Sequence, residues 1–511
     1  MQRPWVGYDE SLAQSSVDKT MQTNRFTDDP LDVVIIGAGF GGLGLGIRLD
    51  KAGISHFLIL DKDHDVGGTW RDNHYPGAAC DVPSHLYSFS FEPKADWRCR
   101  YAGQAEILEY MQHCVRKYQL GTRLRLGREV SRAAFDAASG LWQVSCSNGE
   151  TFSARCLVSA CGQLNRPIYP PIDGRDSFAG PAFHSACWQH EVDLRGKRVA
   201  VIGTGASAIQ FVPPVAEQAA ELLLFQRSAA YVISKDDAPY SSQTQRLFQR
   251  LPLLLKLSRS WHYLTHEIRA LAFIRFPGLM KLLEKGFHAH LHKGVRNPEK
   301  RRQLIPDYPM GCKRMLISDD FYPAIDQDKV QLVTEPISRI TAEGIETLSG
   351  QCHHADVIIY GTGFAASDFL APMQIRGLHG IELNQAWQSG AEAYKGISVS
   401  GFPNLFLLYG PNTNLGHNSI IYMLESQFNY VIDCINRLQR HGLRYMDVKS
   451  ARQDSYNQRL QTALGKTIWN RGCHSWYQTA EGKHTNNWPG YTFSYRHLTR
   501  HPTWTDYDFT G

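Results

Sequence analysis

The stretch LDVVIIGAGFGG, residues 31–42, decides the fold. A short apolar run rich in β-branched residues leads directly into G-x-G-x-x-G at Gly37, Gly39 and Gly42. Gly37 permits a tight turn, Gly39 lets the backbone approach a pyrophosphate, and Gly42 lets the next helix pack close to the sheet. The start of that helix offers unpaired N–H groups and a partial positive charge to phosphate. We therefore predict a dinucleotide-binding strand, turn and helix, with Gly41 as a further contact.

The next apolar run indicates which dinucleotide binds. HFLILD, residues 56–61, ends in Asp61, where the ribose 2′-OH of an unphosphorylated adenosine is expected. The string KDHDVGGTWRDNHYPGAACD follows, and its Gly67, Gly68 and Trp70 indicate backbone packed against a bulky planar ligand. Flavin fits this string better than nicotinamide, so we expect FAD. The alternative is a glycine-rich turn in an unrelated α/β protein.

A second glycine motif lies in KRVAVIGTGASA, residues 197–208. The following run, ELLLFQRS, places Arg227 where an acidic residue would otherwise meet the adenosine ribose. Because an arginine can pair with a 2′-phosphate in bidentate fashion, we expect NADPH rather than NADH. The alternative for Arg227 is a solvated surface charge. The expected contacts of the loop are Gly203, Thr204, Gly205, Ala206, Ser207 and Ala208.

The sequence as a whole predicts an α/β protein. RCLVSACG and ADVIIYGTGF are two more continuous apolar runs, which suit parallel strands covered on both faces. The sequence thus predicts two doubly wound, Rossmann-like dinucleotide-binding domains. Between about 242 and 305, apolar residues recur at helical spacing with Arg and Lys between them, which predicts a helical insertion packed on the body. Contact of this basic amphipathic stretch with a membrane surface stays open as the alternative. The expected divisions are an N-terminal extension (1–30), a first FAD-binding part (31–164), an NADPH-binding domain with the insertion (165–365), and a second FAD-binding part with the C-terminal segment (366–511).

Composition excludes several classes of protein. With 43% hydrophobic and 20% charged residues, the 511-residue chain is neither disordered nor collagen-like, and a net charge of +5 gives no strong argument for nucleic acid. No apolar run reaches the roughly 18 to 20 residues of a membrane span. The eleven cysteines form no C-x-x-C pair and no cluster with zinc spacing, so we expect reduced thiols, no metal site and a cytoplasmic location. Nothing in the sequence predicts an oligomeric state.

Two longer strings resemble the fingerprints of a known family. GTWRDNHYPGAACD contains G-x-W-x-x-x-x-Y-P-G-x-x-x-D, from Gly68 to Asp81, and FAGPAFHSACW contains F-x-G-x-x-x-H-S-x-x-W, from Phe178 to Trp188. Both are similar to the fingerprints of the type I Baeyer-Villiger monooxygenases, which are class B flavoprotein monooxygenases. The resemblance runs from about residue 31 to the C-terminus. One departure is Gln189, where the family usually has proline or aspartate.

The resemblance implies a reaction. In that family NADPH reduces FAD, the reduced flavin takes up O₂, and the resulting C4a-peroxyflavin attacks a ketone carbonyl to give an ester or lactone. It also implies roles in YPMGCKRML: Lys313 faces the NADP phosphate, and Arg314 faces the flavin with Asp81 beside it. A permanently protonated arginine suits an anionic peroxide. The alternative for the pair is a solvated surface.

Further contacts follow from position in the family pattern. The linker residues His184 and Trp188 are expected to couple domain motions rather than to donate protons. Ser228 is expected beside Arg227 at the NADP phosphate. The expected FAD contacts are Thr69, Trp70, Arg71, Asp72, Tyr87, Val130 and Met423.

Two other functions compete with ketone oxygenation. One is a flavin-containing monooxygenase that oxygenates amines or sulfides through a hydroperoxide, and the other is an electron-transferring or sensing flavoprotein. Trp188, Asp81 and Arg314 together favour the Baeyer-Villiger reaction. The choice among linear, cyclic and aryl ketones stays open.

Overall fold

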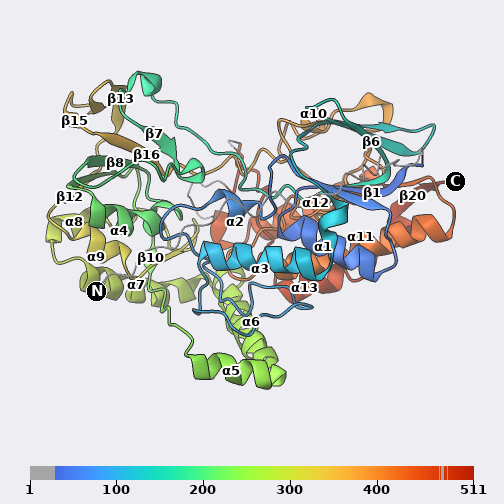
Figure 1. Cartoon of the computed structure of the whole chain (residues 1–511), viewed down its shortest axis with the longest axis horizontal. Coiled ribbons are helices and arrows are strands. Elements are labelled where there is room, and N and C mark those ends of the chain that lie inside the picture. The colour runs from blue at the N-terminus through green and yellow to red at the C-terminus, as the bar shows by residue number, and fades with distance from the viewer. Residues whose placement is uncertain (1–28, 471, 473–476, 480) are drawn as a thin grey trace, which may run out of the picture.

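The computed structural model describes residues 29–470, 472, 477–479 and 481–511, so most of the expected N-terminal extension lies outside the described residues. Two α/β units lie side by side, each with helices against a mainly parallel sheet (Figure 1). The predicted fold class is confirmed.

The first unit is built on an eight-stranded sheet in the order β17-β4-β5-β6-β1-β2-β3, with β18 also paired to β6. β1 is parallel to both of its neighbours, with Val33 opposite Phe57 on one side and Cys156 on the other. Apart from Asp32, every residue of β1 is buried, as the continuous apolar run predicts. The strands are β1 (Leu31–Ile36), β2 (Phe57–Leu60), β3 (Leu124–Arg125), β4 (Val130–Asp136), β5 (Leu141–Cys146), β6 (Thr151–Ser159), β17 (Gln374–Arg376) and β18 (Leu405–Leu407).

The second unit is built on a five-stranded parallel sheet in the order β12-β9-β8-β16-β7. Its central strands are the apolar runs on either side of the second glycine motif and the run before Gly361. The strands are β7 (Ala182–His184), β8 (Arg198–Ile202), β9 (Glu221–Phe225), β12 (Val330–Val333) and β16 (Val357–Tyr360).

The stretch FAGPAFHSACW is part of this second sheet rather than a simple linker. Phe183 and His184 pair with Ile359 and Tyr360, so β7 forms the edge of the sheet. Phe183 and Trp188 are buried in the core of the same unit. A strand of three residues has too little periodicity to be recognised in a sequence.

The predicted helical insertion is present. It comprises α5 (Ser242–Arg250), α6 (Pro252–Ile274), η5 (Pro277–Leu279), α7 (Met280–Gly294) and α8 (Pro298–Gln303). One face of α6 packs on the body through buried residues that include Leu255, Ala270 and Phe273. Figure 1 shows α5 and the adjoining part of α6 projecting from the lower edge of the molecule. Among the described residues, no helix is both long enough and apolar enough to cross a membrane.

The remaining elements complete the two units. Cys312 is disulfide-bonded, so the expectation of reduced thiols is wrong at this residue. The helices are α1 (Phe40–Lys51), α2 (Thr69–Asp72), α3 (Gln104–Lys117), η2 (Leu120–Arg123), η3 (Arg175–Ser177), η4 (Ser185–Cys187), α4 (Ala208–Gln218), α9 (Phe321–Ile325), η6 (Leu378–Gly380), α10 (Leu383–Ala386), α11 (Ile420–Arg440), α12 (Ser450–Leu464), η7 (Ile468–Asn470), α13 (Thr492–Leu498) and η8 (Trp504–Asp506). The other strands are β10 (Val232–Ile233), β11 (Leu316–Ile317), β13 (Ile337–Thr341), β14 (Gly344–Thr347), β15 (Cys352–His354), β19 (Tyr445–Val448) and β20 (Tyr507–Thr510).

Candidate active site

The first glycine loop joins β1 to α1. Gly37 has φ 108°, and a Cβ there would lie 2.6 Å from the carbonyl oxygen of Ala160. A Cβ on Gly42 would collide with the carbonyl oxygen of Gly37, so helix and strand are packed at backbone distance. At Gly39 the nearest atom to a Cβ would be the Cα of Gly68, 4.0 Å away. The loop is therefore tight on the sheet side and open at Gly39, which suits the approach of a pyrophosphate.

A cavity of about 690 Å³ lies over this loop and extends to the second unit. This volume falls within the usual range for small-molecule sites. Two of the predicted FAD contacts lie outside its lining: Gly42 packs within the helix and sheet junction, and Met423 is fully buried in the core. Seven of the predicted NADP contacts also lie outside it: Gly203, Thr204, Gly205, Ala208, Arg227, Ser228 and Lys313. On the helix of Met423, Ile420 and Leu424 line the cavity instead. The predicted residues in the lining are Gly37, Gly39, Gly41, Asp61, Gly68, Thr69, Trp70, Arg71, Asp72, Asp81, Tyr87, Val130, Ala206, Ser207 and Arg314.

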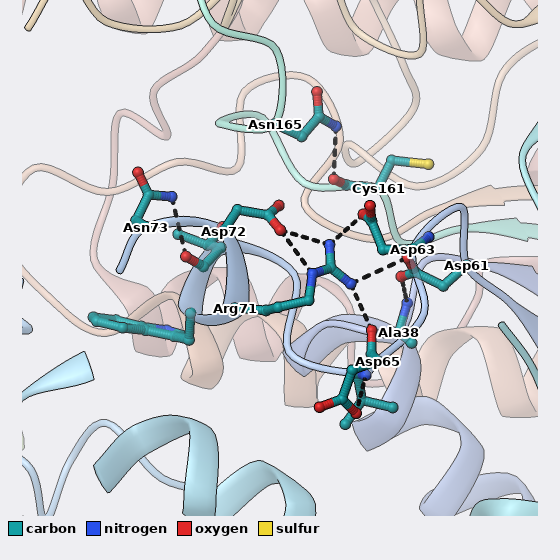
Figure 2. A network of polar contacts seen from close by, with 12 residues as sticks. Ala38, Asp61, Asp63, Asp65, Arg71, Asp72, Asn73, Cys161 and Asn165 are labelled. Atoms are coloured by element: carbon teal, nitrogen blue, oxygen red, sulfur yellow. Dashed lines mark hydrogen bonds and ion pairs between the residues drawn. The ribbon is translucent and has the colours of Figure 1, made fainter. Parts of the chain in front are cut away.

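Asp61 belongs to a polar network at one end of the cavity (Figure 2). Its carboxylate accepts the N–H of Ala38 at 2.7 Å, and Arg71 Nη1 lies 3.3 Å away. The same guanidinium binds Asp72 through Nε at 2.7 Å and donates to Asp63 through Nη2. Burial acts to lower the pKa of Arg71, but the charges of the three carboxylates raise it overall. Arg71 thus ties the end of β2 to α2, a connection that the sequence did not reveal.

Two aromatic side chains add to the wall of the cavity. The indole of Trp70 donates to the hydroxyl of Tyr87 at 3.1 Å, and the two rings meet edge to face with centroids 5.6 Å apart. Phe40, the first residue of α1, packs edge to face on Tyr87. This cluster holds both predicted flavin contacts in fixed positions.

Arg314 and Asp81 form an ion pair on the cavity wall. Nη2 of Arg314 donates to Oδ2 of Asp81, and both residues line the cavity. The charge of Asp81 raises the pKa of Arg314 well above its ordinary value. Burial acts to raise the pKa of Asp81, but the guanidinium outweighs it and lowers the pKa overall. The pair therefore presents a permanent, oriented cation to the cavity.

The second glycine loop repeats the first with one change. Gly203 has φ 109°, and its Cβ would lie 2.5 Å from the carbonyl oxygen of Gly361, whereas a Cβ on Gly205 would meet nothing nearer than 4.0 Å. Ala208 is fully buried, and a Cβ on Gly361 would lie 3.2 Å from its methyl group. Because Gly361 supplies the close approach, the third position of the motif tolerates alanine.

Two cations lie next to this loop. Arg227 is exposed just beyond β9, and Thr204 Oγ1 donates to the carbonyl oxygen of the adjacent Ser228 at 3.3 Å. Burial lowers the pKa of Lys313, and the positive charge of Arg227 lowers it further, while Asp307 opposes the shift. Two cations close enough to repel each other beside a dinucleotide loop form a natural site for an anion such as a phosphate.

Comparisons with known proteins agree with this geometry. A family model described as pyridine nucleotide-disulphide oxidoreductase matches residues 34–251. A Baeyer-Villiger monooxygenase of Pseudomonas aeruginosa is 45% identical over 98% of this chain and 94% of its own length. The chain belongs to the Baeyer-Villiger monooxygenase family. A second member, from Streptomyces coelicolor, is 41% identical over 93% of this chain and 92% of its own length. The solved structure of OTEMO in complex with FAD and NADP matches 94% of this chain and 99% of its own, with a TM-score of 0.84 and 27% identity.

The two family fingerprints meet in space across the two units. The hydroxyl of Tyr75 donates to Oε1 of Gln210 at 2.9 Å, and Nε2 of Gln210 donates to the carbonyl oxygen of Ala79 at 2.9 Å. The rings of Trp188 and Tyr75 pack together, with their centroids 6.5 Å apart. Gln210, on α4 of the second unit, thus clamps the segment that leads to Asp81. A glutamine within a helix gave no signal of this role.

His184 of the second fingerprint is completely buried. Its Nδ1 accepts the N–H of Ala186 at 3.1 Å, and its ring packs edge to face on Tyr169 and Phe364. Burial lowers the pKa of His184 to about 4, so the ring is neutral near pH 7. Since Phe364 also lines the cavity, His184 supports the wall of the site from behind.

Proposed function

We propose that this chain uses NADPH, FAD and O₂ to insert one oxygen atom beside a ketone carbonyl, releasing an ester or lactone. The observation that carries the proposal is the Arg314 and Asp81 pair on the wall of a cavity shared by both nucleotide units. FAD, when bound and reduced by NADPH, supplies the oxygen transfer. Family membership and the FAD- and NADP-bound structure of OTEMO support the choice of cofactors.

In this reaction Arg314 stabilises the negative charge that develops on oxygen as the ketone carbonyl is attacked. A preorganised donor in a site that excludes water contributes most when charge forms beside it. Asp81 orients the guanidinium by a charge-assisted hydrogen bond. Both residues are charged throughout the neutral range, so neither needs to exchange a proton during turnover.

The cofactor sites follow the two units. Residues 31–164 and 366–511 bind FAD, because strands from both ranges form the first sheet. The start of α1 and the open backbone at Gly39 take the pyrophosphate, and Asp61, Gly68, Thr69, Arg71, Asp72, Tyr87 and Val130 surround the rest of the cofactor. Met423 is proposed only as support behind that wall.

Residues 165–365 bind NADPH. The 2′-phosphate lies between Arg227 and Lys313, with Ser228 beside it, and the loop that holds the pyrophosphate comprises Gly203, Thr204, Gly205, Ala206, Ser207 and Ala208. His184 and Trp188 anchor the contact between the two units and so couple their motions. The reaction takes place in the cytoplasm.

The test is product analysis under ¹⁸O₂ with a panel of linear, cyclic and aryl ketones. The expected product carries one ¹⁸O atom in the ester, and NADPH is consumed much faster than NADH. Oxygenated amines or sulfides without any ester would instead establish the flavin-containing monooxygenase alternative. NADPH consumption that releases only hydrogen peroxide with every substrate would refute both.

A further inference from the structure

The outer face of α6 carries an apolar stripe that the protein leaves uncovered. Its five members are between 51% and 67% exposed. They recur at intervals of four, four, three and four residues, so they share one narrow face of the helix. At 1.5 Å per residue the stripe is roughly 22 Å long. Its members are Leu253, Leu257, Trp261, Leu264 and Ile268.

Within the insertion, the segment from α5 to α7 holds an excess of positive charge. Residues 242–294 contain nine Lys and Arg against two Glu, a net charge of +7, although the whole chain carries only +5. The rest of the chain therefore carries −2. Neither glutamate reduces the surface charge much, because Glu267 is buried and Glu284 is partly buried. Eight of the nine cations are exposed: Arg246, Arg250, Lys256, Arg269, Arg275, Lys281, Lys285 and Lys293.

From this combination we infer that the α5 and α6 face docks on the surface of an anionic phospholipid bilayer. A helix with an exposed apolar stripe and flanking cations lies in the plane of a membrane interface, with its apolar side chains between the headgroups. Trp261, in the middle of the stripe, is a side chain that favours this interface. The cations are attracted by the negative surface potential of anionic lipids.

The positive charge of the α5 and α6 face and its projecting position favour a bilayer over other binding partners. A second copy of this chain would bring one +7 surface against another, which opposes pairing. The body of the protein does not cover the stripe, because α6 already packs its opposite face on the core. Figure 1 shows that α5 and the adjoining part of α6 project beyond the body, so a flat surface can approach them.

The same helix reaches the cofactor cavity. Glu267, three residues after Leu264 on α6, accepts a hydrogen bond from Nδ2 of Asn418 at 2.6 Å, and Asn418 lines the cavity. Docking therefore holds the site beside the membrane surface, where apolar ketones concentrate. That consequence rests on the proposed function, whereas docking itself does not.

The experiment is co-sedimentation of the full-length protein with vesicles of phosphatidylcholine, with or without about one third phosphatidylglycerol. We expect binding to the anionic vesicles and little binding to phosphatidylcholine alone. Each cation near the surface contributes roughly fivefold, so losing three of them lowers binding by about 100-fold, and reversing their charge lowers it further. The charge variant combines Arg246→Glu, Arg250→Glu and Lys256→Glu, and its matched control combines Arg155→Glu, Arg440→Glu and Lys466→Glu.

The apolar contribution is tested separately. Leu257→Ser with Trp261→Ser should lower binding by more than about tenfold, since it removes two large side chains from the stripe. The control is Leu348→Ser with Ile381→Ser, at exposed apolar positions outside the insertion. Circular dichroism and the urea midpoint establish that each variant is folded.

Three outcomes would overturn the inference. The first is no binding of the folded wild-type protein to anionic vesicles. The second is equal loss of binding in the matched controls. The third is a stable dimer in light scattering that the stripe variant dissociates, in the absence of vesicle binding; that result would assign the face to a second copy of the chain.

Discussion

Replacing Asp81 with asparagine separates the orientation of Arg314 from its charge. The Asp81 carboxylate is the main cause of the raised pKa of Arg314, so its removal returns that pKa toward its ordinary value. That value still lies far above neutral pH, and the guanidinium stays protonated. What the variant loses is the negative charge of the acceptor, since the amide oxygen of asparagine still accepts from the guanidinium. A hydrogen bond to a charged group contributes about 1.5–3 kcal/mol, which is the upper limit of the loss. If the whole contribution acts on the oxygenation step, ester formation slows by roughly 10- to 150-fold.

Arg314→Ala removes the cation itself and should cost more. Loss of a preorganised donor typically lowers a rate by about 10² to 10³. Stopped-flow absorbance measures flavin reduction by NADPH, and gas chromatography measures the ester. Both variants should reduce flavin at a rate within a few-fold of wild type. The rate of ester formation should fall in Asp81→Asn and fall further in Arg314→Ala. The control Asp193→Asn breaks an exposed carboxylate and arginine pair with Arg195 and should change neither rate.

Ester formation at the wild-type rate in Asp81→Asn would refute the orienting role of the carboxylate. A pH profile that shifts in Asp81→Asn would refute the reasoning in a different way. It would mean that the carboxylate exchanges a proton during turnover.

Three further predictions follow from other parts of the site and the fold. Arg227→Ala should lower the preference for NADPH over NADH by about tenfold or more, measured as the ratio of kcat/KM values, because it removes one of two cations at the 2′-phosphate; an unchanged ratio would mean that NADP binds elsewhere. Gln210→Leu should slow ester formation by a larger factor than it weakens NADPH binding, because it frees the segment before Asp81. Equal effects on both would indicate a purely structural role. Burial raises the pKa of Asp447 to about 7, so the folded state holds its proton more tightly and stability falls as pH rises from about 4 to about 7. Asp447→Asn should remove this pH dependence of the urea midpoint and add roughly 2–4 kcal/mol to the free energy of unfolding at pH 8. An unchanged pH dependence would mean that Asp447 does not cause it.

The sequence predicted the parts of the fold that depend on local signals. The two strand, glycine and helix units need only a buried apolar run and glycines at fixed spacing, and both were found in place. The insertion was recognisable from its helical periodicity. The apolar side that packs on the body and the side that stays exposed could not be distinguished in the sequence, because both carry apolar side chains.

The parts that sequence reasoning missed depend on contacts between distant segments. Arg71 joins Asp61 and Asp63, which follow β2, to Asp72 of its own helix. Arginines and aspartates are common around any turn, so the sequence alone did not predict this pairing. The disulfide of Cys312 likewise could not be predicted, because no spacing of cysteines in the sequence indicates it. Met423 is a different case: Ile420 and Leu424 of the same helix line the cavity, whereas the side chain of Met423 is buried in the core.

Trp188 shows how a family fingerprint acquires a physical meaning. Its ring packs between Phe183 of β7 and Tyr75 of the first unit, while Tyr75 is also held by Gln210 of α4. The edge strand of the second unit and the segment that leads to Asp81 therefore share one aromatic contact. Any shift of the second unit relative to the first must either carry Tyr75 along or break that contact. Because Asp81 is paired with Arg314, the fingerprint links the position of the second unit to the cation on the cavity wall.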